Sequence, residues 1–415
     1  MNDFGKSGRL NVLCLSEHYP PIIGGTVTYV ENSCENLAKL GQNVYLVTYT
    51  TDNVSFPPKK WTTINGYHVF NVGLPLNIPI DTRAGRKYYC HEVKSILLNL
   101  ISTLNVDVIH VMYGHYVAGL FNKLPLKIPV FWTVQNMPPA EYSPISPFQV
   151  PLLNLLVTKI YFSIVELVTI IRFKKYKFTT FIVSSEYVKK ALINKRISST
   201  KIIIIPNGVD DNIFRPVSDS NGRITTTSIF PKILSVAKIS EHKGLHVLLS
   251  ATLKIKRLYP DVLITIIGSI VEERYKKRLD ETIKKYSLEA NWTFITKKLC
   301  IDDLVDYYNK CDLYVQPSIE EGFCLTFLEA SSCGKPVIGT NTGAMPDLIR
   351  FIGQTNGCFP GDSDCLANTV IQVASQPRNF QDSQKQHQII ISKYSWSSVT
   401  KQLLEFYHKQ ITQTN

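Results

Sequence analysis

The sequence predicts an α/β protein with two doubly wound domains, and three observations lead to this prediction. The chain has 415 residues, and a single hydrophobic core rarely serves more than about 250 to 300, so two domains are expected. In both halves, short apolar runs typical of buried strands alternate with segments of helical apolar spacing. A polar stretch separates the halves. We place the domains at 1–205 and 229–385, with a linker at 206–228. A C-terminal helix is expected at 386–415, and the sequence does not decide which domain it packs on.

The first half follows the order strand, loop, helix, strand. The apolar run at 10–15 predicts a strand, the spacing of apolar residues in 27–40 predicts a helix, and 43–49 predicts the next strand. Gly41 is placed to end the helix, because glycine takes the left-handed conformation found after many helices without strain. Further strands in this half are expected at 67–72, 106–111, 130–134, 178–184 and 202–205.

The second half repeats the alternation of strands and helices. Strands are expected at 232–236, 263–267, 292–295, 313–316 and 336–339, and helices at 244–258, 272–286, 302–310 and 323–333. No repeat of fixed period runs through these elements, which argues against a solenoid. A last helix at about 397–408 has an apolar face that would fit either domain.

Cysteine content and the first residues indicate a cytoplasmic protein. The nine cysteines are scattered, with no CxxC pair and no cluster at zinc-ligand spacing, so we expect reduced thiols and no metal site. The apolar run near the N-terminus is too short for a signal peptide.

The formal net charge of +12 predicts an anionic partner. Between residues 172 and 201 nine basic residues stand against the single acid Glu186, and no nucleic-acid-binding motif accompanies them. The preceding segment, 150–173, is apolar but is interrupted by Lys159 and Glu166. It is either a core helix or a helix lying in a membrane interface, and the basic stretch favours an anionic membrane surface over nucleic acid. A peripheral location on the inner face of the membrane is the corresponding expectation.

The strongest motif begins at Pro317 and reads PSIEEGFCLTFLEA. Seven residues separate Glu321 from Glu329, and Gly322 permits a tight turn between a strand and a helix. The amides that follow are then free to face an anionic or hydroxyl-rich ligand, because the first amides of a helix lack partners within it. These amides belong to Phe323, Cys324 and Leu325.

With these residues, followed by Gly334, Pro336 and Val337, the segment resembles the signature of family 4 of the retaining glycosyltransferases, which have the GT-B fold. The resemblance implies two Rossmann-like domains that face a cleft. It also implies that Glu321 faces the donor sugar and Glu329 the ribose hydroxyls. Cys324 stands where the family usually has glycine.

Two further stretches resemble the same family. Lys238 and Lys243, the latter followed by glycine, stand where the family places two cations on the diphosphate, and such cations stabilise the leaving phosphate without a metal. Lysine at 238 replaces the usual arginine and loses its two-pronged geometry. Gly24 and Gly25 resemble the family's N-terminal glycine loop, whose amides approach the diphosphate.

The acceptor side departs from the family pattern. Met112 and Gln135 stand where many relatives have histidine, and neither side chain titrates near neutral pH. His115, three residues beyond Met112, is the candidate replacement, and Asn207 matches a junction motif next to the site. We list His115, Gln135 and Asn207 as acceptor-side candidates.

The resemblance therefore implies an enzyme that moves a sugar from a nucleotide-diphosphate sugar to a hydroxyl of a glycan or lipid-linked acceptor, with retention of configuration, in the synthesis of polysaccharides. It implies no cofactor, since the nucleotide sugar is a co-substrate, and no metal, since lysines can neutralise the phosphate. Two alternatives remain. A silent sugar-nucleotide-binding partner subunit is suggested by the missing histidines, and a nucleotide-sugar epimerase would use the same fold.

Overall fold

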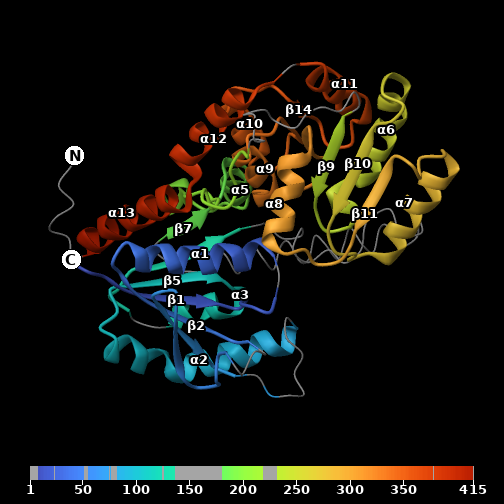
Figure 1. Cartoon of the computed structure of the whole chain (residues 1–415). Coiled ribbons are helices and arrows are strands. Elements are labelled where there is room, and N and C mark those ends of the chain that lie inside the picture. Colours follow the sequence, from blue (N-terminus) through green and yellow to red (C-terminus); the bar gives the residue numbers. More distant parts are fainter. Residues whose placement is uncertain are drawn as a thin grey trace. The chain divides into compact units, whose positions relative to one another are not determined.

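The computed structural model describes residues 8–22, 24–50, 55–73, 75, 82–123, 126–135, 180–217, 231–376 and 378–414. These residues fold into two compact units: those from 209 to 395 form the second unit, and the others form the first (Figure 1). The apolar segment predicted at 150–173 and the basic residues at 172–177 lie outside the described residues. Within the described part, no helix is long and apolar enough to cross a membrane.

The described sheet of the first unit has eight strands in the order β3-β4-β2-β1-β5-β6-β7-β8. All neighbours pair in parallel except β3 and β4. The chain moves from β1 to β2 on one side and later to β5 on the other, so strand order reverses between β1 and β5. The strands are β1 (Asn11–Ser16), β2 (Asn43–Thr48), β3 (Trp61–Ile64), β4 (Tyr67–Asn71), β5 (Val108–Tyr113), β6 (Val130–Val134), β7 (Thr180–Val183) and β8 (Ile202–Ile204).

The second unit carries a six-stranded parallel sheet in the order β11-β10-β9-β12-β13-β14. Here the order reverses between β9 and β12. The predicted α/β class, with two doubly wound sheets, is confirmed. The strands are β9 (Lys232–Val236), β10 (Leu263–Ile267), β11 (Trp292–Ile295), β12 (Leu313–Gln316), β13 (Val337–Thr340) and β14 (Gly357–Cys358).

Helices cover both faces of each sheet. The first unit has α1 (Gly25–Lys39), α2 (Arg83–Thr103), α3 (His115–Ala118), α5 (Glu186–Asn194) and α13 (Trp396–Thr414). The second has α6 (Leu245–Leu258), α7 (Glu273–Lys285), α8 (Ile301–Lys310), α9 (Leu325–Ser332), α10 (Met345–Phe351), α11 (Ser363–Ala374) and α12 (Phe380–Tyr394).

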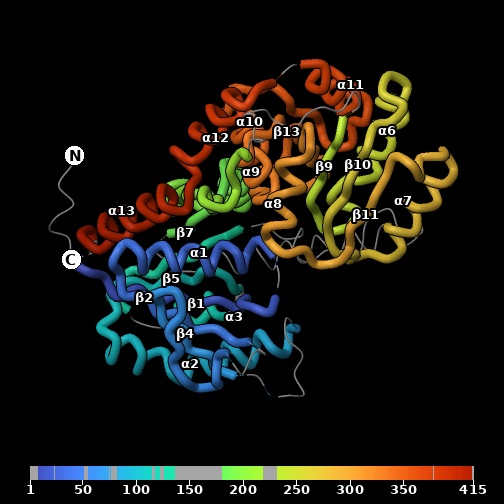
Figure 2. The backbone as a smooth tube through the Cα atoms, in the orientation of Figure 1, coloured from blue at the N-terminus to red at the C-terminus, as the bar shows by residue number. Residues whose placement is uncertain are grey.

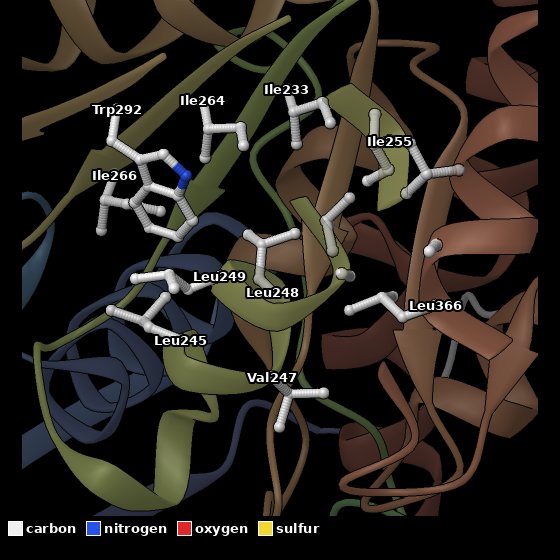
Figure 3. Close-up of a cluster of buried hydrophobic side chains, with 14 of the residues drawn as sticks. Ile233, Leu245, Val247, Leu248, Leu249, Ile255, Ile264, Ile266, Trp292 and Leu366 are labelled. Atoms are coloured by element: carbon white, nitrogen blue, oxygen red, sulfur yellow. The ribbon is translucent and has the colours of Figure 1, made fainter. Parts of the chain in front are cut away.

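Alternation along the central strands divides each unit into two cores. In β1, Leu13 and Leu15 enter the core shared with α2, whereas Val12 and Cys14 enter the core shared with α1 and α13. In the second unit one core lies between the sheet and α6, where Leu245, Leu248 and Leu249 face β9, β10 and Trp292 (Figure 3). The core on the other face holds Tyr314 of β12 and the apolar side of α9.

The last helix packs on the first unit, which settles a packing that the sequence left open. Figure 2 shows α13 running beside α1. The ring of Tyr407 stacks on Phe131, with centroids 5.6 Å apart. At the start of the helix, Trp396 lies so close to Gly208 that a Cβ on that glycine would be 2.5 Å from the indole. Only glycine fits at position 208.

A buried histidine ties this helix to the sheet. His110 of β5 bonds through Nδ1 to the hydroxyl of Tyr407 and through Nε2 to Thr133 of β6, both at 2.6 Å. Thr133 also bonds to the hydroxyl of Tyr29 in α1, at 3.1 Å. Burial lowers the pKa of His110 to about 3, so its ring is neutral and acts as a structural link.

Tyr407→Phe tests this link. The substitution keeps the ring but leaves Nδ1 of His110 buried without a partner, so we expect the free energy of unfolding of the first unit to fall by about 1 to 3 kcal/mol. Urea denaturation followed by circular dichroism measures the loss. Tyr187→Phe, at a tyrosine that is 40% exposed on α5, is the matched control and should change little. Equal effects of the two substitutions would contradict the role of the buried bond.

Candidate functional site

The sequence-predicted donor residues gather at the carboxyl edge of the second sheet, where strand order reverses. Lys238 and Lys243 follow β9, and the loop from Pro317 to Glu321 follows β12, its neighbour in the sheet. In doubly wound sheets this reversal opens a crevice beyond the strand ends, and ligands bind there. Residues that are about 80 positions apart in sequence are thereby brought into contact.

The turn after β9 is fastened to the loop after β12. The amides of Ile319 and Glu320 donate to the carbonyl of His242, at 2.8 and 3.3 Å. Gly244 has a left-handed φ of +67°, and a Cβ there would lie 1.9 Å from the carbonyl oxygen of Pro317. Only glycine permits such an approach, so the lysine-glycine pair of the sequence has a steric cause.

Lys243 and Glu321 form an ion pair at the centre of this region. Nζ of Lys243 donates to Oε2 of Glu321 at 2.6 Å, and the two side chains are 16% and 11% exposed. Ser318 also donates to Oε2, at 3.1 Å. Burial acts to lower the pKa of Lys243, but Glu321 and then Cys324 raise it above its usual value. Lysine is therefore charged here and glutamate is its counter-ion.

Lys238 takes a different position. Its side chain is exposed and forms no hydrogen bond or ion pair with any residue in the described part of the chain. Partial burial, together with the charges of Lys243 and Lys238, lowers the pKa of the nearby His242 to about 4, against the opposing effect of Glu321. Both cations therefore contribute to the positive potential of the turn.

The helix after the loop begins later than predicted. Cys324 has a left-handed φ of +75°, so Phe323 and Cys324 precede α9 and Leu325 is its first residue. A left-handed residue cannot continue a right-handed helix, and this is why the predicted start at 323 is wrong. Glu329 consequently lies one turn into α9 rather than two.

The backbone of the loop before α9 also packs closely against the segment that follows β13. Gly343, which follows β13, has a φ of +59°, and a Cβ there would be 2.7 Å from the carbonyl oxygen of Glu321 and 2.9 Å from that of Gly322. Gly322, Phe323 and Cys324 are all buried. The backbone that carries Glu321 is thus held from two sides.

Glu329 is partly buried in α9 and is the more unusual carboxyl. Its Oε2 accepts a hydrogen bond from the hydroxyl of Tyr308 in α8, at 2.8 Å, and Oε1 bonds to no described residue. Burial raises the pKa of Glu329 to about 7, against the opposing effect of Tyr308. This carboxyl therefore changes protonation near neutral pH.

The candidates of the first unit lie at the carboxyl ends of its strands. Gly24 precedes α1 and Gly25 is its first residue. His115 is the first residue of α3, and its side chain lies outside the described part.

Gln135 and Asn207 meet, since Nδ2 of Asn207 donates to Oε1 of Gln135 at 3.0 Å. The remaining amide atoms of this pair, Nε2 of Gln135 and Oδ1 of Asn207, are buried and have no hydrogen-bond partner among the described residues.

Several polar residues of these sites escaped the sequence reasoning. Ser184, directly after β7, also has a buried hydroxyl to which no residue in the described part of the chain bonds. Tyr308 bonds to Glu329, and Gln316 bonds to the motif residue Ser318, which in turn bonds to Glu321. A polar residue within a predicted buried strand, as Gln316 is, was the available signal, because such residues need a partner.

Glu329→Gln should change stability in a pH-dependent way. The folded-state pKa of about 7 lies above the ordinary value of 4.5, so the carboxyl favours folding when protonated, and that contribution is lost as pH rises through 7. Glutamine mimics the protonated form. We expect the variant to be more stable than the wild type by about 3 kcal/mol at pH 8 and equal to it at about pH 4. Thermal melting across this range measures the difference, and a stability difference independent of pH would contradict the assignment.

Comparison with known proteins agrees with this geometry. Residues 226–396 match the model for glycosyl transferases group 1, and residues 23–213 match that for glycosyltransferase family 4. The lipopolysaccharide 1,2-N-acetylglucosaminetransferase of Salmonella typhimurium is 24% identical over 234 residues, which are 54% of this chain and 60% of that protein. The D-inositol 3-phosphate glycosyltransferase of Corynebacterium urealyticum is 28% identical over 222 residues, 50% of this chain and 51% of that protein. The alignments thus span about half the length of these relatives.

Solved structures share the fold over the whole chain. Sucrose-phosphate synthase from Thermosynechococcus elongatus superposes with a TM-score of 0.74 at 20% identity, covering 98% of this chain and 100% of that one. Anabaena HepE, solved in complex with UDP and glucose, gives 0.68 at 17% identity, covering 96% and 99%. The two family matches together cover both units, and the chain belongs to glycosyltransferase family 4, with the GT-B fold.

Proposed function

We propose that this glycosyltransferase moves a sugar from a nucleotide-diphosphate donor to a hydroxyl acceptor with retention of configuration. The observation that carries the proposal is the partly buried ion pair between Lys243 and Glu321, with Glu329 in the helix that follows. A charge pair held out of water at a sheet reversal contributes little to stability, and it is better explained by a ligand that it serves.

The donor would lie along this edge of the second unit. Glu329 would accept hydrogen bonds from the ribose hydroxyls, and Glu321 would face the sugar. The amides of the loop from Gly322 to Leu325 would approach the diphosphate. Gly24 and Gly25 of the first unit are also proposed to bind the donor, by resemblance to the family's glycine loop. UDP and UDP-glucose are bound in structures of HepE, which has the same fold, and this supports a nucleotide sugar as donor.

Catalysis would rest on charge rather than on a covalent intermediate. The β-phosphate gains negative charge as the glycosidic bond breaks, and Lys243 and Lys238 would stabilise it. The departing phosphate would take the proton of the acceptor hydroxyl, which attacks from the same face and so retains configuration.

Two lysines at the leaving group make a divalent ion unnecessary. The carboxylates with Asp-x-Asp spacing, Asp362 and Asp364, are engaged elsewhere, at the N-cap of α11 and with Lys254.

The acceptor is proposed to be a glycan or lipid-linked saccharide of the cell envelope. The lipopolysaccharide enzyme of Salmonella supports this, as does the serotype-specific mannosyltransferase WbdA of Escherichia coli, which is 31% identical over 179 residues, 42% of this chain and 21% of that protein. Gln135, Asn207 and His115 are the candidates for contact with the acceptor.

A donor screen tests the proposal. The purified chain is incubated with nucleotide-diphosphate sugars, with and without envelope glycan acceptors, and the released nucleotide is measured. Transfer with retained configuration, on at least one donor, is expected. Donor binding without any turnover would instead indicate a silent partner subunit, and an epimer formed without acceptor would indicate an epimerase.

Lys243→Ala should lower kcat more than it weakens donor binding. The lysine acts most strongly on the charge that develops in the transition state, and loss of one such group typically costs on the order of 10²- to 10³-fold in kcat. Steady-state kinetics and calorimetry with the nucleotide separate the two effects. Lys254→Ala, which breaks an exposed ion pair with Asp364, is the matched control. A rise in KM with unchanged kcat would contradict the transition-state role.

We also propose that the first unit binds anionic membranes through its basic surface. Lys190, Arg196 and Lys201 are exposed on and after α5, beside the exposed Tyr187 and Ile193. Each basic residue close to an anionic surface contributes about 1 kcal/mol, and salt weakens the attraction. A lipid-linked acceptor would fit this location.

Reversing these three charges to glutamate should release the protein from anionic vesicles in a sedimentation assay, and raised salt should act in the same direction. The matched control reverses Lys277, Lys284 and Lys285, which are exposed on α7 of the second unit and give the same change in net charge. Equal release by both triple variants would show that only net charge matters. A wild type that ignores anionic vesicles at low salt would exclude the membrane site.

A further inference from the structure

A chain of buried hydrogen bonds leads along β12 to Glu321. The hydroxyl of Tyr314 lies 2.6 Å from Oε1 of Gln316, Nε2 of Gln316 lies 2.9 Å from Oγ of Ser318, and that Oγ lies 3.1 Å from Oε2 of Glu321. Tyr314, Gln316 and Ser318 are each at most 1% exposed. The three occupy every second position, so they share one face of the strand and of the loop that continues it.

The direction of each bond follows from the ion pair at the end of the chain. Glu321 is the counter-ion of Lys243, so its oxygens only accept, and the single hydrogen of Ser318 must point to it. Gln316 therefore presents its NH₂ group to Ser318 and its carbonyl oxygen to Tyr314. Tyr314 gives its one hydrogen to Gln316, and its hydroxyl oxygen also lies 2.9 Å from Oγ1 of Thr326. Every donor in the chain points towards Glu321.

This arrangement divides the two oxygens of the carboxylate. Oε2 receives both Lys243 and Ser318, whereas Oε1 forms no hydrogen bond with any described residue. A carboxylate with one oxygen fixed by two donors has little freedom to rotate, so the second oxygen is held in one place. Such preorganisation is what a ligand hydroxyl, or a charge that appears during reaction, requires.

Buried polar residues on this face of the sheet cost free energy of folding, so their presence calls for an explanation. The same face of the sheet carries the apolar core around Tyr314, Phe327 and Leu328. A buried polar group without a hydrogen bond destabilises the fold through its lost hydration. An apolar residue at 316 would carry no such desolvation cost. The chain is also anchored to β9, because the amide of Val236 lies 3.4 Å from the hydroxyl of Tyr314.

We propose that Gln316 and Ser318 are positioning residues, which orient Glu321 so that Oε1 faces the donor sugar while Oε2 keeps Lys243 in place. The proposal rests on the function proposed above for Glu321. A positioning role differs from a stabilising role, because substitution of a positioning residue slows the reaction and leaves the affinity for the nucleotide unchanged. Glu329, on the next helix, takes no part in this chain.

Four variants test the proposal: Ser318→Ala, Gln316→Met, the double variant and Ser318→Thr. Ser318→Ala and Gln316→Met should each lower kcat about tenfold, and the nucleotide Kd should stay within about twofold. The double variant should be no slower than Ser318→Ala, because the amide acts only through the hydroxyl. Ser318→Thr keeps the hydroxyl and should recover most of the rate.

Controls separate positioning from folding. Ser383→Ala removes another buried hydroxyl of the same unit, which bonds to the carbonyl of Gly334 at 2.9 Å, and should leave kcat unchanged. Melting temperatures are measured for every variant. Parallel losses of kcat, nucleotide affinity and stability, or losses that multiply in the double variant, would overturn the proposal.

Glu321→Gln distinguishes this failure from failure of the proposed function. If the wild type transfers sugar and Glu321→Gln abolishes transfer while the Ser318 and Gln316 variants keep full kcat, only the positioning proposal falls. If the wild type turns over no donor, or Glu321→Gln remains fully active, the role assigned to Glu321 itself is wrong, and the proposal falls with it.

Discussion

The close approach between the turn after β9 and the loop after β12 is the constraint on which the candidate site of the second unit depends. Gly244 lies against the carbonyl of Pro317, and two amides of the loop donate to the carbonyl of His242. These backbone contacts hold the two segments together, and between them Nζ of Lys243 lies 2.6 Å from Oε2 of Glu321. A side chain at position 244 would separate the two segments, and the ion pair would be lost with them. Gly244 therefore contributes to the site because it has no Cβ, and not only because it tolerates a left-handed conformation.

The same edge of the sheet concentrates features that work against stability. Cys324 adopts a left-handed conformation that costs a non-glycine residue about 1 to 2 kcal/mol. Glu329 is held where its charged form is disfavoured, and the Lys243–Glu321 pair is largely removed from water. Such features persist only where the surrounding structure enforces them, and here the cores on both faces of the sheet do so. Their clustering at the strand reversal is itself an argument that this edge binds a ligand.

The sequence predicts most of the fold because buried parallel strands leave a strong apolar signal. All strands expected in the second half are present, within a residue or two. Helix α2 was missed because its buried stripe, Gly85, Tyr89, Val93 and Leu97, is one residue wide. Strand β3 is short, pairs antiparallel at the sheet edge and has no buried residue, although the Asn65-Gly66 turn was a signal for it. The packing of α13 depends on contacts of Trp396 and Tyr407 with residues far away in sequence, which periodicity does not encode.

The candidate site was only partly predictable for a related reason. Motif spacing identifies Glu321, Glu329 and Lys243 as candidates. It does not reveal that Glu321 pairs with Lys243, whereas Glu329 bonds to Tyr308.

The pairing of Glu321 with Lys243 has a consequence for the proposed reaction. While Glu321 holds Lys243, the ion pair offsets the charge of the lysine, and the exposed Lys238 would be the cation that meets the diphosphate of the proposed donor. If the donor sugar engages Oε1 of Glu321, Oε2 would still hold Lys243 in place, and the charge of the lysine would act on the phosphate as the bond breaks. The ion pair would thus keep the lysine in position before the donor arrives and supply its charge when it is needed, which neither residue does alone.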